Sequence, residues 1–163
     1  MANYDVIVHT ADEDGAGTDA NVFIRLFGAH RRHSREYELD NPDRNDFEQG
    51  NRDHFILRKV PDDLGEVRAI TIRQDNTGLY AAWTLDAVHV RRPGGRWKEF
   101  PVHDTLEGGT GDNCVGWVIR DDGSKSCVSH SDKQSRSRWD QFQDFWEDAA
   151  SVLEDAVEFL GAA

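Results

Sequence analysis

The sequence has no excess of positive charge. Its 163 residues carry 19 Lys and Arg residues against 31 Asp and Glu residues, which gives a formal net charge of −12. This balance argues against nucleic acid as a partner, because neutralising phosphates requires a basic face. It also opposes binding to an anionic membrane, unless a bound cation reverses the sign of the charge locally.

Segments that would export or anchor the chain are also missing. The opening stretch, MANYDVIVHTADEDG, has no basic start followed by an apolar run, so no signal peptide is visible. No stretch approaches the roughly 18 apolar residues of a membrane span. These absences favour the cytoplasm, with at most a peripheral association with membranes. The two cysteines, Cys114 and Cys127, do not decide the compartment, because they would be thiols in a reducing cytosol and could pair after export by another route.

Signatures of common enzymes are absent as well. The seven histidines show no HExxH spacing for a zinc hydrolase, and the chain has no GxSxG motif for a lipase. Cys114 has no histidine close in sequence that marks it as a nucleophile. His54 and His89 fall within expected strands and are interpreted as sheet residues. We therefore expect no catalysis.

The chain does contain many short apolar and alternating segments. Asn, Asp, Gly and Pro residues separate them, and no helical period occurs before residue 135. Short strands at regular spacing are typical of an antiparallel β-sandwich or barrel. The expected strands span residues 4–8, 21–28, 35–39, 53–58, 66–73, 83–91, 97–102 and 117–119.

From Ser137 onward the apolar period becomes helical. The pattern predicts an amphipathic helix over residues 135–163, joined by a linker over 119–134 to a sandwich over 1–118. The opposite helix face is acidic, which argues against an anionic-membrane helix. Two interpretations stay open, because the apolar stripe could pack on the sandwich or bind a partner helix. The stripe comprises Trp139, Phe142, Trp146, Ala149, Leu153, Ala156 and Leu160.

An acidic, glycine-containing loop, EDGAGTD, precedes the second expected strand. The spacing Asp12-x-Asp14-x-x-Gly17 resembles the start of an EF-hand, but its twelfth position is Phe23, where a bidentate Glu is required. The EF-hand interpretation therefore fails. Glycines in the loop let the backbone turn carbonyl oxygens inward, with Asp19 at the start of the strand.

Calcium takes six to eight oxygen ligands, so one such loop is insufficient. A second oxygen-rich loop contains Asn45, Asp46 and Glu48, and a third turn contains Asp75 and Asn76. Loops at one end of a sandwich come together in space. The three loops could therefore form one calcium site, although each is also consistent with a turn held by hydrogen bonds from its own side chains.

The amino-acid sequences of these loops, and their order along the chain, resemble those of the PLAT domain, also called the lipoxygenase homology domain. The matching motifs are GAGTDANVFIRLFG, NDFEQGNRDHF, DLGEVRAITIRQDNTGLYAAWTLDAVHV and WKEF, and they extend over residues 3–118. The family occurs in lipoxygenases, lipases, polycystins and a clostridial phospholipase toxin. The resemblance implies an eight-stranded β-sandwich of two four-stranded sheets.

The resemblance also implies a calcium site in the loops at one end. Some family members have an additional acidic ligand just before the tryptophan that corresponds to Trp83. This chain has Ala81 and Ala82 there, so that ligand is absent. Asp75 or Asn76 is the expected substitute. The implied ligands are the carbonyl oxygens of Gly15, Gly17 and Thr18 and the side chains of Asp19, Asn45, Asp46, Glu48 and Asp75.

Family members use exposed apolar residues on these loops to meet membranes or partner proteins. Here the resemblance implies that Leu79 and Tyr80 mediate weak, reversible, calcium-dependent binding to a lipid surface. The iron chemistry of lipoxygenases belongs to a large helical domain that this chain lacks. In the alternative interpretation, the chain binds a protein through Trp139, Phe142 and Trp146, and calcium only stabilises the sandwich.

Overall fold

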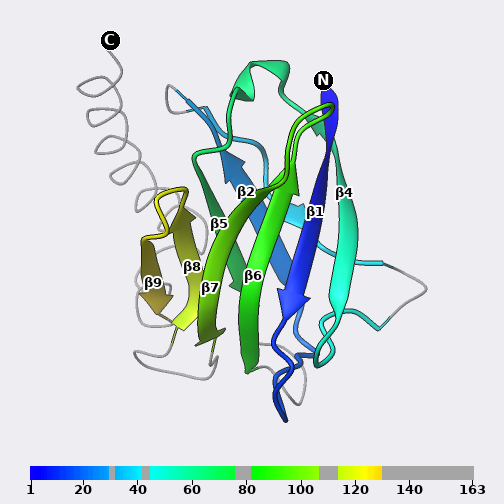
Figure 1. Ribbon diagram of the computed structural model, residues 1–163, viewed down its shortest axis with the longest axis vertical. Helices are drawn as coiled ribbons and strands as arrows, with labels where there is room; N and C mark the ends of the chain where they lie inside the picture. Colours follow the sequence, from blue (N-terminus) through cyan, green and yellow to red (C-terminus); the bar gives the residue numbers. More distant parts are fainter. Residues whose placement is uncertain (30–31, 42–44, 76–81, 107–113, 130–163) are drawn as a thin grey trace.

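The computed structural model describes residues 1–29, 32–41, 45–75, 82–106 and 114–129. Within them, two antiparallel sheets pack face to face (Figure 1), which confirms the expected all-β sandwich. One sheet has the order β4-β1-β6-β7, from β1 (Ala2–Thr10), β4 (Arg52–Val60), β6 (Trp83–Arg91) and β7 (Lys98–Leu106). The other has the order β3-β2-β5-β8-β9, from β2 (Val22–Phe27), β3 (Tyr37–Glu38), β5 (Ala69–Gln74), β8 (Cys114–Arg120) and β9 (Lys125–Ser129). A 3-10 helix, η1 (Asp62–Leu64), precedes β5.

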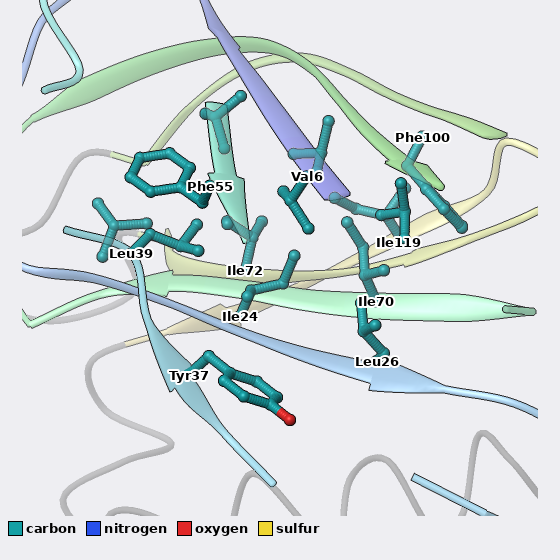
Figure 2. Close-up of a cluster of buried hydrophobic side chains, with 14 of the residues drawn as sticks. Val6, Ile24, Leu26, Tyr37, Leu39, Phe55, Ile70, Ile72, Phe100 and Ile119 are labelled. Carbon is teal, nitrogen blue, oxygen red and sulfur yellow. The ribbon is translucent and has the colours of Figure 1, made fainter. Parts of the chain in front are cut away.

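The alternating sequence pattern explains how the strands face the core. In β1, Tyr4, Val6 and Val8 are buried, whereas the residues between them are partly exposed. Side chains from both sheets meet in the core, among them Val6 and Ile70 (Figure 2). Burying such apolar surface is the main favourable contribution to folding.

The sandwich continues beyond residue 118, where the sequence analysis placed a linker. Strand β8 ends at Arg120, and β9 pairs with it through a tight turn. Gly123 adopts a φ of 88°, and the Asp122 carboxylate accepts a hydrogen bond from the Ser124 N–H at 2.8 Å. The second sheet therefore has five strands instead of the expected four. Cys127 of β9 is disulfide-bonded, and the other cysteine of the chain is Cys114.

Several expectations concern residues that the structure does not describe. The amphipathic helix over residues 135–163 lies outside the described residues, together with Trp139, Phe142 and Trp146. Among the residues that are described, no helix is long and apolar enough to cross a membrane.

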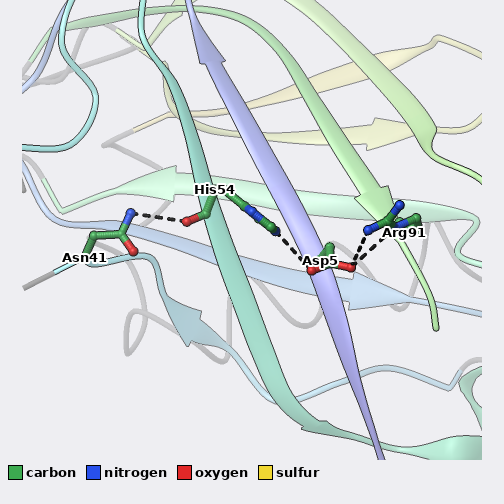
Figure 3. Close-up of polar contacts among 4 residues, drawn as sticks. All are labelled: Asp5, Asn41, His54 and Arg91. Atoms are coloured by element: carbon green, nitrogen blue, oxygen red, sulfur yellow. Dashed lines mark hydrogen bonds and ion pairs between the residues drawn. The ribbon is translucent and has the colours of Figure 1, made fainter.

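An ion-pair network crosses three strands on the outer face of the first sheet (Figure 3). Asp5 of β1 contacts the His54 Nε2 atom at 3.0 Å and accepts a hydrogen bond from the Arg91 Nη2 atom at 3.1 Å. Burial works to raise the pKa of Asp5, but the bonds from His54 and Arg91 lower it below its ordinary value of 3.8. The folded state therefore favours the Asp5 carboxylate.

We expect Asp5→Asn to destabilise the protein at about pH 6 by about 0.5–1 kcal/mol, as for a partly exposed ion pair. Because the folded-state pKa is lowered, this stabilisation is present above the unfolded-state value of 3.8 and is lost as the pH falls further. Melting temperatures of both proteins across this range measure the effect. An equal difference at about pH 3 and about pH 6 would contradict it.

Candidate functional site

Two loops meet at the end of the sandwich where β1 ends and β6 begins. We define the first loop as residues 11–21 and the second loop as residues 45–51. The Thr18 N–H donates to the Phe47 carbonyl oxygen at 3.0 Å, and the Gly50 N–H donates to the Ala11 carbonyl oxygen at 3.1 Å. The Thr84 N–H of β6 donates to the Ala16 carbonyl oxygen at 2.9 Å. Backbone hydrogen bonds therefore connect the first loop to both the second loop and the sheet.

Gly17 lies close to the backbone of the second loop. A Cβ atom at this position would lie 2.9 Å from the Phe47 carbonyl oxygen and 3.3 Å from the Gln49 nitrogen. Both neighbours are backbone atoms, so the loop backbone would have to move to accommodate a side chain. The glycine of the GAGTD motif is thus explained by close packing between the loops.

Aromatic residues fix the base of the second loop. Phe47 has a φ of 62° and is 4% exposed. Its ring lies 5.2 Å from the ring of Trp83 and 5.6 Å from the ring of Phe55. Trp83 is fully buried and donates its Nε1–H to the Thr10 Oγ1 atom at 3.0 Å. The core thereby holds a left-handed backbone conformation that a bulky residue rarely adopts.

Two adjoining hollows lie at the two loops, and Leu39 and Asp40, which belong to neither loop, also line the smaller one. The larger, of 300 Å³, is lined by Gly15, Gly17, Thr18, Asp19, Glu48 and Gln49. The smaller, of 160 Å³, is lined by Thr18, Asp19, Asn45 and Asp46, among others. All of the predicted calcium ligands except Asp75 therefore line one of the two hollows. Thr18 and Asp19 line both.

Asp46 is held in place by Asn41. Its two carboxylate oxygens accept hydrogen bonds from the Asn41 N–H at 2.7 Å and the Asn41 Nδ2–H at 3.0 Å. Asn41 also donates to the His54 carbonyl oxygen at 3.2 Å, as Figure 3 shows. A carboxylate oxygen has two lone pairs, so these bonds orient Asp46 and leave it able to bind a cation.

Asp75 has a different position from the one expected of a ligand. It lines neither hollow, and its two carboxylate oxygens accept hydrogen bonds from the Asn21 N–H at 3.0 Å and the Asn21 Nδ2–H at 2.8 Å. Asn21 lines the smaller hollow. The described contacts of Asp75 therefore secure the end of the first loop. Asn76, Leu79, Tyr80 and Ala81 lie outside the described residues.

Sequence reasoning missed the roles of Asn21 and Asn41. Each asparagine uses its backbone and side-chain N–H groups to bind both oxygens of one aspartate. For Asn41, which lies five residues before Asp46, the local turn chemistry of asparagine was an available signal. For Asn21 and Asp75, which are 54 residues apart, no local signal exists.

The chemistry of the hollows fits a hard cation. Within the described ranges, no three His, Cys, Asp or Glu side chains converge on one point. A metal here would therefore depend on backbone carbonyl and amide oxygens as well as on carboxylates. Among the described residues that line the two hollows there is no His or Cys, and a donor set made of oxygens suits calcium better than zinc or copper.

The fold and the loops define an antiparallel β-sandwich domain with oxygen-lined hollows at one end. The family model described as "PLAT/LH2 domain" matches residues 4–114, and the chain belongs to this family. Over 87 residues the chain is 44% identical to "Lipoxygenase homology domain-containing protein 1" of Mus musculus. This match covers 53% of this chain and 4% of that protein.

Two solved lipoxygenase structures are similar in fold. Coral 8R-lipoxygenase, described as calcium-activated via a C2-like domain, matches with a TM-score of 0.62 and 27% identity over 73% of this chain and 17% of that one. A calcium-dependent 11R-lipoxygenase matches with a TM-score of 0.57 and 28% identity over 74% of this chain and 17% of that one. The chain thus spans a small part of each of these relatives.

Proposed function

We propose that the chain is a non-catalytic calcium-binding module that attaches reversibly to a lipid surface, or to a protein associated with one, through the loops at one end of its sandwich. The observation that carries this proposal is the convergence of the two loops around Asp19. There, carboxylate, amide and backbone oxygens from both loops line two adjoining hollows.

The proposed calcium ligands divide by chemistry. Gly15, Gly17 and Thr18 supply carbonyl oxygens, whereas Asp19 and Glu48 supply carboxylates. Asn45 and Asp46 contribute from the side of the smaller hollow. A bound calcium ion would lower the negative charge of this end and could bridge to anionic head groups, which the net charge of −12 otherwise repels. The calcium-dependent lipoxygenases that this chain resembles support the proposal.

The alternative is a protein-interaction module that acts through residues 135–163, with calcium confined to a structural role. Its sequence basis is the stripe containing Trp139, Phe142 and Trp146, which lies outside the described residues. Truncation after Ser129 tests this alternative. The protein-interaction alternative would be favoured if the full chain dimerises while the shortened chain stays folded and monomeric.

Calcium is expected to raise the melting temperature of the full chain. A ligand that binds only the folded state at about 100 times its Kd stabilises it by about 2.7 kcal/mol. Asp19→Ala combined with Glu48→Ala removes two carboxylates from the larger hollow and should abolish the rise. Differential scanning calorimetry with calcium and with EDTA measures the effect.

The matched control is Asp14→Ala combined with Glu13→Ala. Asp14 and Glu13 are exposed residues of the same loop that line neither hollow. The control removes the same charge and should keep the calcium-induced rise. No rise in the unaltered protein, or equal loss in both double variants, would refute the assigned calcium site.

Vesicle co-sedimentation tests the lipid part of the proposal on the same proteins. The unaltered chain should sediment with phosphatidylserine-containing vesicles in calcium and remain in the supernatant in EDTA. The Asp19→Ala, Glu48→Ala variant should remain in the supernatant in both conditions. Failure of the unaltered chain to bind vesicles in either condition would favour the protein-binding alternative.

A further inference from the structure

A third hollow lies at the opposite end of the sandwich from the first and second loops. It has a volume of 360 Å³ and is formed by the β6–β7 hairpin and the segment that leads into β5. At the start of β6, Trp83 contacts the second loop and Thr84 contacts the first loop, whereas Arg91 is the last residue of that strand. Nine strand residues separate the two ends by roughly 30 Å, and Figure 1 shows the hairpin and the tip of β1 at opposite ends.

The hairpin concentrates positive charge on an acidic protein. Residues 91–98 contain four Arg and Lys residues and no Asp or Glu, although the net charge of the chain is −12. Lys98 is neutralised locally, because its Nζ atom lies 2.7 Å from a Glu66 carboxylate oxygen. Arg91 pairs with Asp5 at 3.1 Å. The remaining cations, Arg92 and Arg96, line the hollow.

Arg92 and Arg96 are available to an incoming anion. Arg92 and Arg96 are exposed, and within the described residues their side chains form no hydrogen bond or ion pair, although the charge of Arg92 acts on the Glu66 carboxylate, which also lines the hollow. They flank a Pro-Gly turn in which the Gly95 N–H donates to the Arg92 carbonyl oxygen at 2.9 Å and Gly94 has a φ of 72°. This is the signature of a type II turn. A turn of this kind limits the freedom of the backbone that carries both arginines, which reduces the entropy lost on binding.

The hollow also has an apolar lining. Val67 and Val90 are 6% and 2% exposed and line it together with Trp97. Trp97 is 38% exposed, and the Arg91 guanidinium lies 4.4 Å from its ring centre. Arginine and tryptophan side chains around a concave apolar surface are typical of the residues that dominate protein–protein binding energy.

We propose that this hollow, which we call the hairpin site, binds an acidic peptide segment of a partner protein. Arg92 and Arg96 would contact its carboxylates, and an apolar side chain of the segment would pack against Val67, Val90 and Trp97. The choice of a protein over a membrane rests on the proposed function. When the first and second loops contact a lipid surface, the hairpin site points away from that surface. One domain would then connect a membrane to a protein.

A fluorescence anisotropy titration tests the hairpin site. The probe is a fluorescein-labelled synthetic peptide of alternating Glu and Asp residues with two Leu residues, titrated with the full chain in EDTA and without vesicles. We expect saturable binding that weakens when the salt concentration rises from about 50 to about 300 mM. Arg92→Gln combined with Arg96→Gln should weaken binding about tenfold.

Arg52→Gln combined with Arg58→Gln is the matched control, because it removes two exposed charges of β4 that do not line the hollow. The Kd of this control for the peptide should lie within about twofold of that of the unaltered chain, since salt screens the effect of distant surface charges. Equal weakening in both double variants would overturn the proposal. So would binding of a control peptide with Gln and Asn in place of Glu and Asp, because recognition would then not depend on carboxylates.

Nuclear magnetic resonance provides a second readout that does not depend on substitution. Peptide-induced shifts in the amide signals should be largest at residues 66–67 and 90–98, and shifts confined to other residues would overturn the site. Calcium-free binding of anionic vesicles that requires Arg92 and Arg96, without peptide binding, would assign the hairpin site to lipid instead. The titration contains no calcium, so its failure is distinguishable from failure of the proposed calcium function.

Discussion

Trp83→Ala is expected to lower the free energy of unfolding by about 3–5 kcal/mol. Trp83 is fully buried, so its removal leaves a large cavity in addition to the lost apolar burial. The substitution also removes the hydrogen bond to Thr10 and the ring contact with Phe47. Because Phe47 forms the base of the second loop, we expect the variant to lose calcium binding as well as stability.

Urea unfolding followed by far-ultraviolet circular dichroism measures this effect. Trp97→Ala is the matched control, since it makes the same chemical change at a residue that is 38% exposed. The control should cost about 1 kcal/mol or less, as is usual for surface positions. Similar losses in the two variants would show that Trp83 does not contribute as a core residue.

Gly17→Ala is expected to lower the free energy of unfolding by about 1–3 kcal/mol and to abolish the calcium-induced rise in melting temperature. The new methyl group would lie 2.9 Å from the Phe47 carbonyl oxygen and 3.3 Å from the Gln49 nitrogen. The loops would have to separate, which moves Asp19 away from Glu48. Calorimetry with calcium and with EDTA measures both parts of the prediction.

Gly94→Ala is the control for this prediction. Gly94 has a φ of 72° and open space around it, so alanine there costs about 1 kcal/mol through backbone strain alone. It lies on the β6–β7 hairpin, far from the first and second loops, and should keep the full calcium response. A normal calcium response in Gly17→Ala would refute the importance of the close contact between the loops.

The strands were predictable wherever alternation was strong. The expected strand over residues 83–91 coincides with β6, and within the expected strand over residues 21–28 the alternating Val22, Ile24 and Leu26 are buried in β2. Strand β9 was missed because its residues, KSCVS, are mostly polar. It is held by backbone pairing with β8 and by the turn at Asp122 and Gly123, and neither produces a hydrophobic period.

The candidate calcium site was predictable in composition and only in part in geometry. The sequences and the order of the loops indicated Asp19, Asp46 and Glu48 as candidate ligands. The structure places all three in the lining of two adjoining hollows. The position of Asp75 beside Asn21 was not predictable. Asn21 and Asp75 are 54 residues apart in the sequence, and only the pairing of β2 with β5 brings them together.

Local patterning therefore sufficed for the fold class and the family, and it indicated the oxygen-bearing residues that line the two hollows of the first and second loops, because these features depend on residue types at short spacings. Other features depend on distant segments that only the packed sandwich brings together. The loop contact at Gly17 joins the first loop to the second, and the hairpin site joins Val67 to Arg92 and Arg96. The sequence shows that arginines cluster between residues 91 and 96. Packing of the hairpin against the segment before β5 turns that cluster into a concave site with an apolar lining, at the opposite end of the domain from the first and second loops.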